Sequence, residues 1–257
     1  MPTTMPEGYY NRFDPAKNFD QILNGLYNSY VLLAVPLFVF AGHLMNHSGI
    51  TERLIKLSTV MTGWISGGLA HVAIMLSALM GGVSGSAVAD AAMEARVLGP
   101  SMVKSGLSKG YACAAMSVGS LITATIPPSV GLIIYGYLGN VSIGRLFAGG
   151  IVPGILMTIF LMGTAYVIAK RRNYQPELKS RPAMKEILAA AWDAKWALVF
   201  PVFLIVGIRY GIFTPSEAGA FACAYAVVIG KLVFRQSGLL SGKQLDSLIA
   251  QIQALEV

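Results

Sequence analysis

The sequence predicts an all-α integral membrane protein with several crossing helices, one re-entrant helical hairpin and one proline-broken helix. Of the 257 residues, 55% are hydrophobic and only 12% are charged, whereas soluble domains carry about 25% charged residues. Long runs lack Asp, Glu, Lys and Arg, and each is long enough for the roughly 20 apolar residues of a crossing helix: residues 21–51, 57–89, 110–144 and 146–169. Helix-breaking segments lie at the end of the second run, GGVSGSAVAD at 81–90, and within the third, TATIPPS at 123–129.

The elements follow from the alternation of apolar and charged segments. The first 25 residues are polar and contain no early apolar core, so they do not resemble a signal peptide. We expect apolar segments and loops in this order: a span and a connecting arm helix at 26–66, the hairpin at 67–100, the broken helix at 108–140, a span at 145–170, a basic loop with an amphipathic helix at 171–195, two shorter spans at 196–234, and a polar tail at 235–257.

The distribution of lysine and arginine residues predicts which loops face the cytoplasm. If residues 67–98 enter the bilayer and return to the same side, four of the 19 basic residues lie on one side and all others lie opposite: Arg12, Lys17, Arg145 and Arg209. The positive-inside rule then places the N-terminus in the periplasm and the C-terminus in the cytoplasm. A single crossing weakens this asymmetry, and two full crossings would need arms longer than about 16 residues. The pattern therefore favours a re-entrant hairpin.

The glycine and serine residues at the centre of this hairpin predict a break in the helix. Non-helical backbone at membrane depth is tolerated only where protein covers it or where it lines a polar cavity. Ser84, Gly85 and Ser86 are therefore candidates to bind an ion or a substrate. Alternatively, these small residues permit close helix packing, as we also expect for GWISG at 63–67 and GIVPG at 150–154.

The second break is predicted at two consecutive prolines. Pro127 and Pro128 remove two backbone N–H donors, and the residue before a proline is pushed out of helical geometry. The carbonyl groups freed around residues 123–124 then need partners, which the hydroxyls of Thr123, Thr125 and Ser129 can supply. A bound cation would serve equally well, and a purely structural kink is the alternative.

Two polar interruptions at membrane depth are typical of the binding site of a secondary transporter. Hydroxyl and carbonyl oxygens are hard ligands that suit a hard cation. Since Ser86 and Thr125 lie at the two breaks, we predict that both contribute to an ion site. We predict no other metal site and no organic cofactor.

Asp90 and Glu94 are four residues apart and share one face of the arm that follows the first break. Carboxylates inside a membrane are functional candidates by default, so Asp90 is a candidate to bind a proton, an ion or a substrate. Glu94 is close to Arg96, and we expect it at the cytoplasmic surface. An acid–base pair of these two residues would instead indicate a membrane-embedded enzyme.

Other motifs exclude several functions. His43 and His47 are one helical turn apart, but no matching Asp, Glu or Cys accompanies them, so we interpret them as an interfacial pair rather than a metal site. The chain contains neither G-x-x-x-x-G-K-[ST] nor G-x-S-x-G, which argues against ATP hydrolysis by a P-loop and against a hydrolase. Cys113 and Cys223 lie in apolar segments and are expected to serve packing. The net charge of +7 reflects the cytoplasmic loops and does not indicate a nucleic-acid partner.

Four segments together resemble one known family. VLLAVPLFVFAGHLMNHSGI, SGSAVADAAMEARVLGPSMVKSGLSKGYACAAM, TATIPPSVGLIIYG and GIFTPSEAGAFACAYAVV resemble, in this order, the large membrane subunit of tripartite ATP-independent periplasmic (TRAP) transporters. The resemblance extends from about residue 30 to residue 234. The combination of the SGS and VAD elements with IPPS is the most specific part of it.

The resemblance implies a sodium-coupled secondary transporter of the bacterial inner membrane that imports organic acids, such as C4-dicarboxylates or sialic acid. It also implies a periplasmic substrate-binding protein, a small membrane subunit and an elevator-type movement. Carried onto this chain, the first hairpin corresponds to residues 67–98 with its tip at Ser84, Gly85 and Ser86, and the broken helix corresponds to residues 123–129.

The chain departs from the family in length. The family builds its site from two inverted halves, and this sequence holds the first half, followed by a polar tail. We therefore expect either a fragment or one half of a permease that a second chain completes. The alternatives are a non-transporting remnant or scaffold protein and, less in keeping with the motifs, a membrane-embedded enzyme.

Overall fold

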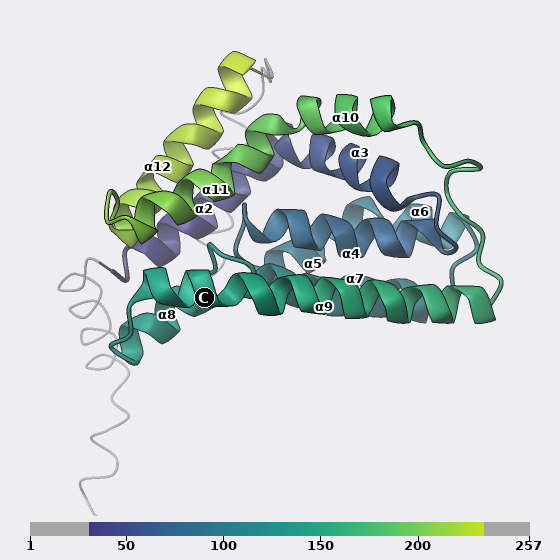
Figure 1. The fold of residues 1–257 in the computed structure, drawn as a ribbon, viewed down its shortest axis with the longest axis horizontal. Helices are drawn as coiled ribbons and strands as arrows, with labels where there is room; N and C mark the ends of the chain where they lie inside the picture. The colour runs from purple at the N-terminus through teal and green to yellow at the C-terminus, as the bar shows by residue number, and fades with distance from the viewer. Residues whose placement is uncertain (1–30, 234–257) are drawn as a thin grey trace, which may run out of the picture.

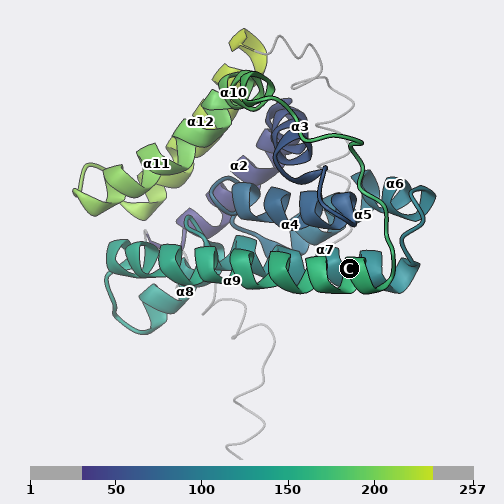
Figure 2. The same ribbon diagram turned by 45° about the vertical axis from the view of Figure 1, so that its right-hand side comes forward.

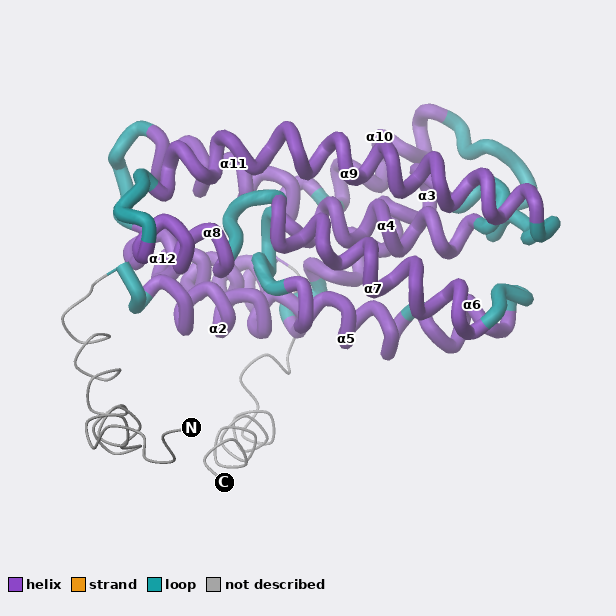
Figure 3. Tube along the Cα trace, turned by 90° about the horizontal axis from the view of Figure 1, so that it is seen from below, coloured by secondary structure: helices purple, strands orange, loops and turns teal. Residues whose placement is uncertain are grey.

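A computed structural model describes residues 31–233, which form an all-helical arrangement without strands in that range (Figure 3). The predictions for residues 1–25 and 235–257 and for the beginning of the first span lie outside the described residues. The helices are α2 (Ala34–His47), α3 (Ile50–Thr62), α4 (Gly68–Gly81), α5 (Ala87–Val97), α6 (Gly99–Lys104), α7 (Lys109–Thr125), α8 (Val130–Leu138), α9 (Ile143–Arg171), α10 (Met184–Asp193), α11 (Lys195–Arg209), α12 (Pro215–Val228) and the π-helix η2 (Ile229–Val233).

The helices pack in layers around α4. The long helix α9 extends along one face, next to α4 and α7, while α3 and α10 cover the opposite face (Figure 1). Helices α2, α11 and α12 gather at one end, where α12 packs along α2 (Figure 2). Segments far apart in the sequence thus surround α4, the first arm of the predicted hairpin, while α5, the second arm, packs one face against α7.

Among the described residues, one helix is long and apolar enough to cross a membrane by itself, namely α9 with 29 residues. This helix covers the segment in which a span was expected, at 145–170, and its crossing of a membrane stays a prediction. Two bent pairs raise the number of candidate spans to three: α7 with α8, bent by 48°, and α10 with α11, bent by 63°. Helices α2 and α12 have 14 residues each, fewer than the roughly 20 of a typical crossing helix.

The basic segment at 171–195 contains the helix that the sequence predicts. The side chains of Met184, Leu188 and Trp192 on α10 are exposed and lie on one face. On another side, the Asp193 carboxylate forms ion pairs with Arg53, at 3.3 Å, and with Lys56, at 3.5 Å, which attach α10 to α3. The helix is therefore amphipathic, and its position on a membrane surface stays a prediction.

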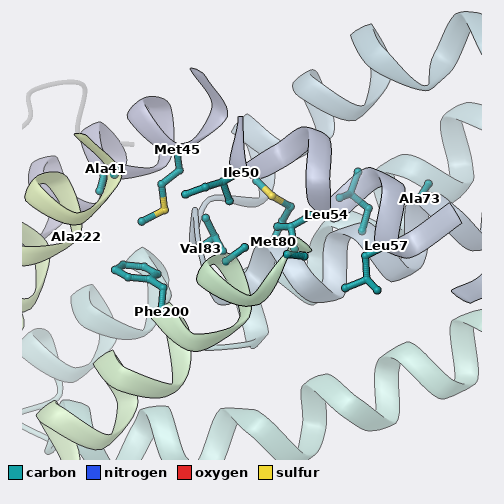
Figure 4. Close-up of a cluster of buried hydrophobic side chains, with 14 of the residues drawn as sticks. Ala41, Met45, Ile50, Leu54, Leu57, Ala73, Met80, Val83, Phe200 and Ala222 are labelled. Carbon is teal, nitrogen blue, oxygen red and sulfur yellow. The ribbon is translucent and has the colours of Figure 1, made fainter. Parts of the chain in front are cut away.

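The first break is anchored in the main hydrophobic core. Val83, at the turn between α4 and α5, is 1% exposed and lies in one cluster with Met45, Ile50 and Phe200. Figure 4 shows Val83 beside Met80, with Met45 and Ile50 on one side and Phe200 on the other. Contacts from α2, α3 and α11 therefore hold the turn in place.

The arms of the predicted hairpin fold back on one another. α4 ends at Gly81 and α5 begins at Ala87. The Ser77 hydroxyl, on α4, donates a hydrogen bond of 2.6 Å to Glu94 Oε1, on α5. The helix–turn–helix shape agrees with the predicted hairpin, and its entry from the cytoplasm remains a prediction.

Cysteine labelling tests this entry. In a background carrying Cys113→Ala and Cys223→Ala, we expect Ser66→Cys and Pro100→Cys to react only with a reagent that reaches the cytoplasm, because both ends of a re-entrant hairpin lie on the same side. Arg145→Cys, in the loop predicted to be periplasmic, is the control and should react from outside. Labelling of residue 66 or residue 100 from the periplasm would contradict the re-entrant arrangement.

Candidate functional site

The first break is a tight turn that requires glycine. Gly85 has a φ of +62°, in the left-handed region that residues with a side chain rarely adopt. Ser86 then caps α5, since its hydroxyl accepts a hydrogen bond from Ala89 N at 3.5 Å. Ser84 is buried, and its hydroxyl donates to Asp90 Oδ2 at 2.6 Å. The side chain of Ser84 therefore links the turn to the first carboxylate of α5.

One carbonyl group that the second break frees has a hydrogen-bond partner within the break itself. α7 ends at Thr125 and α8 begins at Val130, with a cis peptide bond between Pro127 and Pro128. The Ser129 hydroxyl donates to Ala124 O at 2.6 Å. Thr123 is buried, and its hydroxyl donates to Ser77 O on α4 at 2.9 Å. The hydroxyls of Thr123 and Ser129 are thus already bonded to carbonyl groups of the protein.

The two breaks lie in direct contact. Val130 N donates a hydrogen bond of 3.3 Å to Gly85 O. A Cβ atom at Gly85 would overlap Pro128 O, so only glycine lets the two chains approach this closely. The sequence predicts each break separately, and the structure brings them together in one place.

Close helix packing surrounds this contact. A Cβ atom at Gly42 of α2 would lie 3.1 Å from Ser84 Cα, and one at Gly82 would overlap the Pro201 ring of α11. A Cβ at Gly150 of α9 would lie 2.6 Å from Thr125 O, and one at Gly154 would overlap Ile126. The packing role expected of GIVPG is therefore confirmed, and glycines of α2 and α9 also contribute to the surroundings of the breaks.

The two predicted cation ligands are not joined by a hydrogen bond within residues 31–233. The Thr125 hydroxyl donates to Leu121 O at 3.0 Å and contacts Met157 Sδ at 3.6 Å, on α9. Ser86 is half-buried and caps α5. A shared ion site of Ser86 and Thr125 therefore stays a prediction.

The surface position expected for Glu94 is wrong. Glu94 is 0% exposed, as is Asp90, because α5 turns this face toward α4 and α7. Sequence reasoning gave too much weight to Arg96, which is exposed although it follows only two residues later. The burial of Glu94 could have been predicted from the four-residue spacing, which puts this residue on the same face of the helix as Asp90. Ser77, the hydrogen-bond partner of Glu94, carried no signal of its own.

The histidine residues remain outside this site. The rings of His43 and His47 lie edge to face, with centroids 4.9 Å apart. His71 is buried, and its ring nitrogens contact Gly67 O at 3.4 Å and Met162 O at 3.2 Å. In residues 31–233, no three His, Cys, Asp or Glu side chains group in a way that could hold a metal ion.

The described residues are all-helical, with one apolar helix of spanning length and two helix breaks that meet in the interior, and these are the features of a helical membrane protein. The comparison with protein families is more specific. Residues 9–252 match the model of the DctM component of tripartite ATP-independent periplasmic transporters. The chain belongs to this family, whose members are embedded in the membrane.

Individual relatives agree with this assignment. The sialic acid TRAP transporter large permease protein SiaM of Vibrio cholerae is 42% identical over 216 residues, which cover 83% of this chain and 49% of that protein. The 2,3-diketo-L-gulonate TRAP transporter large permease protein YiaN of Escherichia coli is 37% identical over 228 residues, or 89% of this chain and 53% of that protein. The C4-dicarboxylate TRAP transporter large permease protein DctM of V. cholerae is 35% identical over 224 residues, which cover 86% of this chain and 49% of that protein. The chain thus spans about half the length of these relatives.

Proposed function

We propose that this chain forms part of a secondary transporter that imports organic acids across the bacterial inner membrane. The observation that carries the proposal is the contact between the two helix breaks, where Val130 N bonds to Gly85 O. Interrupted helices that meet at membrane depth provide the free backbone groups and helix ends with which secondary transporters bind substrates and ions. Membership of the DctM family supports the same conclusion.

The finer properties of this function follow by analogy with relatives. The relatives named for sialic acid, diketogulonate and C4-dicarboxylate all carry acidic substrates by name, so the proposed substrate is an organic acid. We further propose coupling to sodium, delivery by a periplasmic binding protein, and assembly with a small membrane subunit and with the second half of the permease. A further relative is the isethionate TRAP transporter permease protein DctMQ of Oleidesulfovibrio alaskensis.

The membrane-embedded enzyme receives no support from the geometry of the carboxylates. Asp90 and Glu94 have no exposed surface, and each accepts a hydrogen bond from a serine hydroxyl. A general acid or base must come within hydrogen-bond reach of its substrate. The enclosed pair favours a role inside the hairpin over chemistry on a bound molecule.

Uptake into proteoliposomes tests the proposed function. The complete permease, with its small subunit and binding protein, should accumulate at least one labelled organic acid from a panel of C4-dicarboxylates, sialic acid and sugar acids when a sodium gradient points inward. Collapse of the gradient with a sodium ionophore is the control. Absence of accumulation for every acid of the panel would favour the non-transporting remnant.

Hydroxyl substitutions test the ion site. In the complete transporter, we expect Ser86→Ala and Thr125→Ala each to raise the sodium concentration for half-maximal uptake about fivefold, because one oxygen ligand contributes on the order of 1 kcal/mol. The measurement is the initial uptake rate against sodium concentration.

Matched controls separate ion binding from helix stability. Ser108→Ala removes another serine that caps a helix, since the Ser108 hydroxyl accepts from Tyr111 N at 3.4 Å. Thr164→Ala removes a hydroxyl that donates to the carbonyl one turn earlier, Phe160 O, as that of Thr125 does to Leu121 O. Both controls should keep the wild-type sodium dependence. Unchanged half-saturation in Ser86→Ala and Thr125→Ala would remove these residues from the ion site.

A further inference from the structure

The two carboxyl groups of α5 form an enclosed pair with incomplete hydrogen bonding. Asp90 and Glu94 are each 0% exposed. One oxygen of each accepts a serine hydroxyl at 2.6 Å, from Ser84 and from Ser77. The other oxygen of each, Asp90 Oδ1 and Glu94 Oε2, is buried without a hydrogen-bond partner in the described structure. The residues of this half of the permease alone enclose the pair, so further subunits are not needed to bury it.

Within residues 31–233, no lysine, arginine or histidine side chain forms an ion pair with Asp90 or Glu94. On α4, His71 faces Gly67 O and Met162 O. On α7, the Tyr111 hydroxyl donates to Ala165 O. The basic residues of α5, α6 and α7 all have exposed side chains: Arg96, Lys104 and Lys109. The two ion pairs found within residues 31–233 both involve Asp193, on α10.

Two ionised carboxylates in this place would be costly. When a carboxylate is buried without a cation, the free energy of hydration that it loses is far larger than the free energy gained from one neutral hydrogen bond. Such a group takes up a proton instead. Two like charges one helical turn apart also repel each other. A proton needs a single oxygen atom, whereas hard metal ions need several oxygen ligands at once. A proton is therefore the ligand that suits the two unpartnered oxygens.

We propose that the Asp90–Glu94 pair is a proton-binding site, in which at least one carboxyl group is neutral at pH 7 and keeps the turn between α4 and α5 closed through Ser84. Ser84 transmits the effect because its hydroxyl binds Asp90 while its backbone lies against Gly42 of α2. Removal of the proton leaves two buried negative charges, which draw water into the turn and open it. The inference concerns the folded hairpin and does not depend on the proposed transport function.

Infrared spectroscopy of the complete permease tests the protonation directly. Exposed carboxyl groups are ionised at pH 7, so a C=O stretching band of protonated carboxyl at this pH reports buried groups. We expect wild-type protein to show this band, and Asp90→Asn or Glu94→Gln to reduce it. Glu186→Gln, at an exposed carboxylate of α10, is the control and should leave the band intact.

Hydrogen exchange tests the effect on the turn. We expect the protection of amides 80–90, measured relative to α9, to fall as pH rises in the wild type, because raising the pH removes the proton. The double variant Asp90→Asn with Glu94→Gln should keep constant protection. Tyr174→Phe controls for a titration away from the turn, at the far ends of α4 and α7, since hydrogen bonds with Ser108 and Arg172 lower the pKa of Tyr174 to about 8.

Two results would overturn the proposal. The first is a wild-type spectrum without a protonated-carboxyl band at pH 7, which needs no variant and is therefore independent of whether a variant folds. The second is protection of amides 80–90 that varies with sodium concentration and not with pH, which would assign the pair to a metal ion. Failure of uptake would leave both measurements unaffected, so this inference and the proposed function fail separately.

Discussion

Replacement of Gly85 by valine is expected to abolish uptake by the complete transporter and to give the largest loss of stability among substitutions at the turn. Gly85 has a φ of +62°, and a left-handed conformation costs a residue with a side chain about 1–2 kcal/mol. The new Cβ would also overlap Pro128 O, which belongs to the backbone of the second break and cannot rotate away. The variant must therefore separate the two breaks. The measurements are the melting temperature in detergent and the initial uptake rate.

Gly106→Val is the matched control for this prediction. Gly106 has a φ of +89°, but nothing lies within 4 Å of a Cβ built there. It carries the backbone cost without the overlap, so its melting temperature should fall less and uptake should persist. Equal effects of both substitutions would show that the contact with Pro128 is unimportant.

Replacement of Gly154 by leucine is expected to separate α9 from the second break. A Cβ at Gly154 would overlap Ile126, and overpacking of a closed interface costs about 1–3 kcal/mol or more. This cost exceeds the gain of roughly 1 kcal/mol that a glycine replacement brings to a helix interior. The variant should therefore melt at a lower temperature and lose most of its uptake.

The same helix supplies the control. Gly163 is also on α9, is exposed, and has nothing within 4 Å of a Cβ. Gly163→Leu keeps the gain in helix propensity without the overlap, so the melting temperature should stay constant or rise. A lower melting temperature in Gly163→Leu than in Gly154→Leu would refute the packing argument.

The sequence alone predicted the local features of the site, because proline and glycine act through their own backbone chemistry. The breaks at 82–86 and 126–129 follow from the loss of N–H donors at Pro127 and Pro128 and from the glycines of the first turn. The partnership of Ser129 with the freed carbonyl of Ala124 is also local. Such features need no knowledge of distant segments.

The remaining features depend on contacts across long stretches of chain. The sequence does not reveal that Gly85 meets Pro128, that Gly42 packs on Ser84, or that Ser77 binds Glu94. Glu94 was misplaced for this reason, since its neighbour Arg96 indicates a surface while the packing of α5 against α4 and α7 decides the burial. Burial of a polar residue is a property of the assembled helices and not of its sequence neighbours.

The contact of Gly82 with Pro201 can form only late in synthesis, because Pro201 follows Gly82 by more than a hundred residues. The ribosome makes residues 130–201 after it has made the second break, which takes about 4–15 s at about 5–20 residues per second. During this interval α11 is absent, and one side of the turn at residues 82–86 lacks its cover. Non-helical backbone exposed to lipid is strongly unfavourable. We therefore expect the nascent hairpin to stay out of contact with lipid until α11 is inserted.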